Sequence, residues 1–106
     1  MDKIEKQRIL EELGGFPEDI YDDLVGEFIK QAKEEIVTLK KHIKTNNAED
    51  GARIAHSIKG SSANLRLNEM QEIAKKLEMG LKEGAEPMSL LPDAEELERK
   101  INEFSL

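Results

Sequence analysis

The sequence predicts an all-α fold: an antiparallel up-down-up-down four-helix bundle with an additional short N-terminal helix. Apolar residues recur at spacings of three and four along nearly the whole chain, and no segment alternates apolar and polar residues over strand length. Only 4% of the residues are aromatic, so the core must consist of aliphatic side chains, which suit packed helices better than a β-sandwich. Short connections between the helical segments make neighbouring helices antiparallel.

Length and composition exclude several classes of protein. The 106 residues predict a single domain, residues 1–106, and the net charge of −7 disfavours non-specific binding to nucleic acid or to anionic membranes. The chain has no cysteine, which excludes disulfides and thiolate chemistry, and no apolar segment approaches the length of a membrane span. We therefore expect a cytoplasmic domain, and a monomer because the apolar stripes are used up within one bundle.

The first two helices are separated by a Gly14-Gly15 pair. A short amphipathic helix over residues 2–13 ends at this pair and is expected to pack across one end of the bundle. Pro17 and two acidic residues begin the longest helix, which ends in a basic turn before Thr45. His42 in this turn is expected to be a helix-end cation without a site role. The expected core stripe of this helix is Ile20, Leu24, Phe28, Ala32, Ile36, Leu39 and Ile43, flanked by Tyr21, Val25, Ile29 and Val37.

Capping signals define the remaining helices. Asn47, with an acidic residue three positions later, is a good N-cap for a third helix over residues 48–65. Asn68, with Gln71 three positions later, gives a similar signal for a fourth helix, which Gly84 is expected to terminate. A loop over residues 85–88 precedes a final helix over residues 89–104, which tolerates Pro92 in its first turn.

The third helix carries two different faces. One is an ordinary core stripe of Ile54, Ile58, Ser61 and Leu65, on which Ser61 is expected to be a buried hydroxyl. The opposite face carries small residues and one imidazole: Ala52, His56, Lys59, Gly60 and Ala63.

Gly60 on this second face needs an explanation. A solvent-facing stripe in a chain that is 37% charged should hold long side chains. Glycine in a helix interior costs about 1 kcal/mol relative to alanine. Gly60 therefore serves either close helix packing or, as its position beside His56 favours, the approach of another molecule to the ring.

The chemistry of His56 and Lys59 suggests group transfer. A neutral imidazole is a nucleophile, a base or a metal ligand near pH 7, and a lysine one turn away suits phosphoryl oxygens. The sequence has no second histidine at i+4, no catalytic triad spacing and no P-loop, so a metal-dependent or hydrolytic site lacks partner residues. We predict that His56 accepts a group that a partner protein brings.

Residues 55–78, AHSIKGSSANLRLNEMQEIAKKLE, resemble the signature of histidine-containing phosphotransfer (HPt) domains of two-component phosphorelays. That signature reads A-H-x-L-K-G and continues through apolar positions to L-E or L-Q. One position departs from the signature: Arg66 stands where the family usually has glycine. This difference is expected to change either the end of the third helix or the rim of the surface that docks a partner. The matching residues are Ala55, His56, Ile58, Lys59, Gly60, Ser61, Leu65, Met70, Leu77 and Glu78.

The resemblance implies a role for each site residue. His56 would accept the phosphoryl group on Nε2, Lys59 would offset the phosphoryl charge, and Glu78 would orient the imidazole by accepting a hydrogen bond from Nδ1–H. The residues expected to bind the partner are Ala52, Gly60, Ala63 and Arg66.

The resemblance also implies a function for the whole chain. It would be a phosphoryl carrier, not an enzyme, with receiver domains of response regulators, a hybrid sensor histidine kinase, or both as partners. It would hold no cofactor and no metal of its own, and Mg²⁺ would sit on the receiver.

Two alternatives stay open at this point. The chain could be an HPt-like helical adaptor that binds a partner through the same face without carrying phosphate. Glu78 could pair with Lys75 or Lys82 on its own helix instead of with His56.

Overall fold

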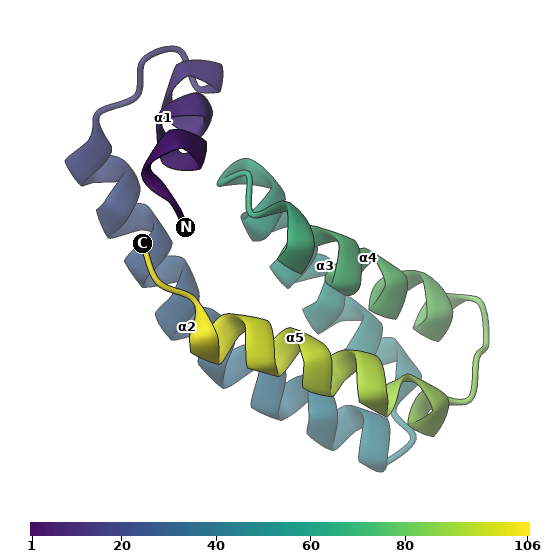
Figure 1. Ribbon diagram of the computed structural model, residues 1–106. Helices are drawn as coiled ribbons and strands as arrows, with labels where there is room; N and C mark the ends of the chain where they lie inside the picture. Colours follow the sequence, from purple (N-terminus) through teal and green to yellow (C-terminus); the bar gives the residue numbers. More distant parts are fainter.

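The computed structural model describes residues 1–106 and contains only helices (Figure 1). The order along the chain is α1 (Lys3–Glu12), α2 (Glu18–Lys44), α3 (Ala48–Asn64), α4 (Asn68–Lys82), a 3₁₀ turn (Pro87–Leu90) and α5 (Leu91–Glu103). No helix combines the length and apolarity that a membrane crossing requires. The predicted all-α class is confirmed, and each predicted helix is present to within two residues at either end.

Helices α2 to α5 form the four-helix bundle. Each of them packs antiparallel on the next, and α5 returns to pack on α2 (Figure 1). Helix α1 lies beside the first turns of α2, at the end of the molecule where the chain turns from α3 into α4 (Figure 1). The molecule is elongated, 42 × 21 × 18 Å, and one continuous core runs through the bundle. This core is mostly aliphatic, as expected, but it also includes Tyr21 and Phe28.

The predicted core face is wrong at the start of α2. Tyr21 and Val25 are buried, whereas Ile20 and Leu24 are 47% and 45% exposed. The buried residues follow the helical period: at about 100° per residue, Tyr21 lies about 60° around α2 from the buried Ile36, whereas Ile20 lies about 160° from it. The Tyr21 hydroxyl donates a 2.7 Å hydrogen bond to the carbonyl of Leu65 in the turn between α3 and α4, which adds to the burial of this ring.

Two predicted details of α3 and α4 are also wrong. Ser62, not Ser61, is the buried hydroxyl, and it donates to the carbonyl of Ile58 at 2.7 Å. Asn68 is not an N-cap but the first residue of α4, and no side chain caps that end.

The reason for the second error lies in how α3 ends. Arg66 has a φ of +61°, its N–H donates to the carbonyl of Ala63, and the N–H of Leu67 donates to that of Ser62. These two hydrogen bonds form a Schellman motif. Arg66 in the left-handed conformation and the buried Leu67 connect the end of α3 to the start of α4. Glycine suits the left-handed position best, which explains why the HPt signature usually has glycine where this chain has Arg66.

Candidate functional site

His56 lies on α3 and presents one ring nitrogen to the protein and the other to solvent. Its side chain is 65% exposed, and Nδ1 is 2.7 Å from Oε2 of Glu78 on the adjacent helix α4. A carboxylate can only accept, so Nδ1 carries the proton when the imidazole is neutral. The lone pair is then on Nε2, the nitrogen available to an approaching reactant.

Glu78 is the buried centre of this site. Its side chain is 4% exposed, and it accepts from Lys59 Nζ on Oε1 at 2.6 Å and from Lys82 Nζ on Oε2 at 2.9 Å, in addition to His56. Burial alone would raise the pKa of Glu78, but the hydrogen bonds from Lys59, Lys82 and His56 outweigh it and lower the pKa to about 2. Glu78 is therefore ionised at neutral pH despite its burial.

The sequence left two alternative partners for Glu78, His56 or a lysine on its own helix, and the structure contains both contacts. The carboxylate contacts both His56 across the helix pair and Lys82 on its own helix, while Lys75 makes no ion pair with it. Lys59 contacts the same carboxylate from α3. His56, Lys59 and Glu78 are thus brought together as expected, with Lys82 as a fourth member.

The two glycines of α3 have different surroundings. A Cβ on Gly51 would lie 3.2 Å from the Leu81 side chain, so Gly51 permits close packing of α3 on α4. A Cβ on Gly60 would meet no atom within 4 Å. Close packing therefore does not explain Gly60, and the space above it belongs to the exposed surface beside His56.

The surface on the other side of His56 is hollowed. An open hollow of about 570 Å³ lies between the start of α3 and the end of α4. Ala52 is 5% exposed and contributes to the lining of this hollow, which corrects the expectation that it lies on the solvent face. The hollow is lined by Ala48, Glu49, Ala52, Arg53, His56, Leu81 and Lys82.

The remaining predicted partner residues lie on α3 and in the turn that follows it. Ala63 is half-buried, two turns beyond His56. Arg66 lies ten residues beyond His56, about 15 Å along the helix axis, where its side chain contacts the carbonyl of Ala63 and Glu12 of α1. The structure does not bring Arg66 to the imidazole.

Arg53 is the site neighbour that the sequence analysis missed. It lies three residues before His56, a spacing that places both side chains on one helix face and could have revealed it. Its guanidinium pairs with Asp50 at 2.9 Å and Glu49 at 3.4 Å. The structure contains no group of three or more His, Asp or Glu side chains that could hold a metal ion.

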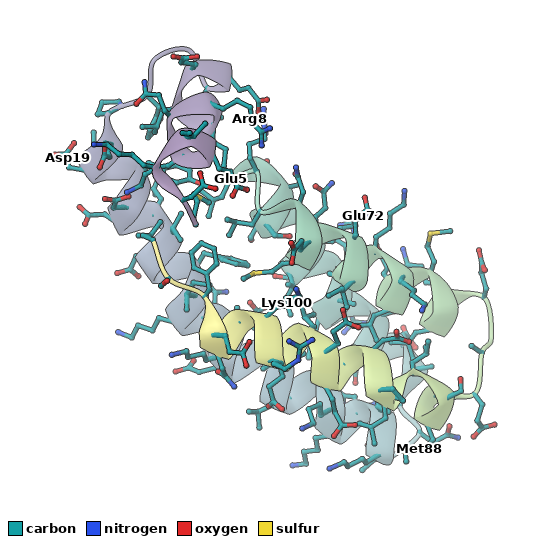
Figure 2. All side chains as sticks on the ribbon, in the orientation of Figure 1. Glu5, Arg8, Asp19, Glu72, Met88 and Lys100 are labelled. Atoms are coloured by element: carbon teal, nitrogen blue, oxygen red, sulfur yellow. The ribbon has the colours of Figure 1, made fainter.

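The surface on the Gly60 side of His56 lacks a long side chain at Gly60 and Ala63. Charged side chains project over other parts of the molecule, as at Glu5, Arg8 and Glu72 (Figure 2). An exposed imidazole with a buried carboxylate behind it and Gly60 one turn away is accessible to a protein surface as well as to a small molecule.

Comparison with protein-family models gives one match, the Hpt domain, over residues 23–105. The matched segment includes all four members of the His56 site and excludes α1. Searches of curated proteins and of solved structures returned no match to the chain.

Proposed function

Because this chain belongs to the Hpt domain family, whose members carry out histidine phosphotransfer in phosphorelays, we propose that His56 is its phosphoacceptor. The phosphoryl group would come from an aspartyl phosphate of a receiver domain, or from a kinase, and pass to another receiver. One observation carries the proposal: Glu78 binds Nδ1 of His56 and leaves Nε2 exposed.

The transfer step follows from this geometry. The Nε2 lone pair forms the N–P bond while the P–O bond of the aspartyl phosphate breaks and releases the aspartate carboxylate. The ring keeps its proton on Nδ1 and becomes a phosphoimidazolium, whose positive charge the Glu78 carboxylate stabilises. The reverse sequence, with a second receiver aspartate as the nucleophile, returns a neutral imidazole.

The chain's own contribution to this step is position and charge. Phosphoryl transfer needs mainly alignment and neutralisation of the phosphoryl oxygens. We expect Lys59 to offset part of that charge and the receiver partner to supply Mg²⁺, so the carrier binds no cofactor and has no turnover alone.

The docking surface surrounds His56. Gly60 and Ala63 on one side and the hollow containing Ala52 on the other leave the imidazole accessible to a receiver. Arg66 is on the far rim of such an interface. Gly60→Gln should therefore slow transfer from a receiver and leave folding intact, since its side chain enters open space.

Transfer of labelled phosphate tests the proposal. The protein is mixed with several receiver domains that already carry ³²P-aspartyl phosphate, and the label is followed on wild type, on His56→Gln and on His42→Gln. We expect acid-labile, alkali-stable label on wild type and on His42→Gln, and none on His56→Gln. His42→Gln is a matched control because it removes the chain's other histidine, which lies at the end of α2.

Two results would contradict the proposal. Label that persists in His56→Gln would place the phosphoryl group elsewhere. A folded wild type that binds receivers through the His56 face but takes no label would favour the adaptor function.

A further inference from the structure

The Lys59 contact raises a question that the proposed function does not answer. Lys59 is proposed to offset phosphoryl charge, yet its Nζ lies 2.6 Å from Oε1 of Glu78. Glu78 is 4% exposed, and a buried carboxylate that loses its counter-ions is strongly destabilising. Lys59 can turn to a phosphoryl group only if another cation stays with Glu78.

We propose that Lys82 is the cation that stays with Glu78. It is a positioning residue that keeps the carboxylate paired while Lys59 turns to the phosphoryl group on His56. This inference rests on the proposed function. Lys82 Nζ lies 2.9 Å from Oε2 of Glu78, on the oxygen that Lys59 does not use. The two residues are one turn apart on α4, so their contact does not depend on α3, which carries His56 and Lys59.

The charges of the site support this division of roles. Glu78 contributes one negative charge and Lys59 and Lys82 contribute two positive charges, while an imidazole that acts as the nucleophile contributes none. One positive charge is thus in surplus, and it is present only because Lys82 is there. Without Lys82, the charge of Lys59 is committed to Glu78.

No other nearby cation can replace Lys82. Arg53 is paired with Asp50 and Glu49 at the start of α3. Lys75, three residues before Glu78 on α4, makes no ion pair with it. Lys75→Gln is therefore a matched control for Lys82→Gln: the same substitution, on the same helix, at a lysine outside the site.

The lifetime of phosphohistidine provides the measurement. Phosphoramidate phosphorylates histidine directly, with release of ammonia, so the experiment needs no receiver. The half-life of the alkali-stable label that is absent from His56→Gln is measured at pH 7 for wild type, Lys82→Gln, Lys82→Arg and Lys75→Gln. We expect Lys82→Gln to shorten it about two- to fivefold, the range of a partly exposed ion pair, Lys82→Arg to restore it and Lys75→Gln to leave it unchanged.

A second pair of variants asks whether Lys82 acts through Glu78. In Glu78→Gln there is no buried charge to neutralise, so Lys59 is free already. Adding Lys82→Gln to Glu78→Gln should then have no effect on the half-life. An equal loss in both backgrounds would mean that Lys82 contacts the phosphoryl group itself and would overturn the proposal, as would an unchanged half-life in Lys82→Gln alone. Circular dichroism of each variant checks that it is folded.

Failure of this inference differs from failure of the proposed function. Chemical label on His56 that no receiver donates or removes would contradict the phosphorelay function and leave the Lys82 comparison valid. Label that receivers exchange normally, with equal half-lives for wild type and Lys82→Gln, would overturn the role of Lys82 alone. A wild type in which phosphoramidate does not label His56 would overturn both.

Discussion

The His56 site and the α1 end of the molecule are held together in different ways. At the site, three donors from two helices converge on one buried carboxylate, Glu78. At the α1 end the polar contacts are separate: Lys6 with Asp22 at 2.8 Å, Arg66 with Glu12 at 3.8 Å, and the N-terminal amine with the carbonyl of Ser105 at 2.6 Å.

This difference predicts how each region responds to substitution. Interactions that share one residue fail together when that residue is removed, whereas dispersed ones fail singly. The family match begins at residue 23, within α2, so the concentrated site lies in the part of the chain that is typical of the family and α1 lies outside it. The variants below test the contrast, from the largest expected effect to the smallest.

Glu78→Gln should have the largest effect on stability. It removes the charge that pairs with Lys59 and Lys82 and replaces it with a buried amide, which should lower the free energy of unfolding by about 2 kcal/mol at pH 7. Urea denaturation followed by circular dichroism measures it. If Glu78→Gln lowered the free energy of unfolding no more than Glu72→Gln, a substitution at an exposed carboxylate, then Glu78 would not be the residue on which the interactions of the site depend.

The same variant makes a pH prediction. Folding lowers the pKa of Glu78 from 4.5 to about 2, so its ion pairs stabilise the fold fully above pH 4.5 and are lost as the pH falls toward 2. The urea midpoint of wild type should therefore fall more steeply than that of Glu78→Gln between pH 5 and 3. If the urea midpoints of wild type and Glu78→Gln fell in parallel with pH, Glu78 would not be the cause of the acid destabilisation.

Tyr21→Phe should have the next largest effect, at the opposite end of the bundle. It removes the hydrogen bond to the carbonyl of Leu65 and should cost about 1 kcal/mol of stability. The phosphohistidine half-life should not change, because Tyr21 is not among the residues that contact His56 or Glu78. A changed half-life would show that the two regions are coupled.

Arg66→Gly should stabilise the protein slightly. Relief of the left-handed conformation favours the variant by about 1 kcal/mol, and loss of the ion pair with Glu12 and of the side-chain hydrogen bond to the carbonyl of Ala63 offsets part of that gain. Asn46→Gly is the matched comparison, because Asn46 also has a positive φ, of 58°, but asparagine tolerates it. The gain in melting temperature should be larger for Arg66→Gly, and the reverse order would refute this account.

Lys6→Gln should have the smallest and most local effect. It removes the ion pairs of α1 with Asp22 and Glu18 on α2. Amide hydrogen exchange should become faster in α1 and stay unchanged in α3 and α4. Faster exchange around His56 would mean that α1 supports the site after all.

Much of the fold was predictable because its signals are local. Proline, glycine and asparagine mark the helix ends, and helical spacing separates buried from exposed positions along α4 and α5. His56, Lys59 and Glu78 were recognisable as a group because their spacing matches a family signature. The asparagine at position 68 misled because the end of the preceding helix, at Arg66, determines where α4 begins.

Two of the wrong predictions concern adjacent residues of which only one follows the helical period of the core. At about 100° per residue, Tyr21 lies about 60° around α2 from Ile36 and Ile20 about 160° from it, so the expected stripe had drifted off the core face. In α3, Ser62 follows the buried stripe in the same way and Ser61 does not. The double use of Glu78 by Lys59 and Lys82 depends on side-chain conformations in three dimensions, which spacing along the chain does not specify.

The exposure of His56 has a consequence for how long a signal lasts. Its side chain is 65% exposed, so a phosphoryl group on Nε2 would stand in water with no lid above it. Under the proposed function, two processes would then end the signal. Water would hydrolyse the phosphohistidine at a rate that the contacts of Lys59 and Lys82 with Glu78 influence, and partner proteins that reach the exposed ring would remove the phosphoryl group.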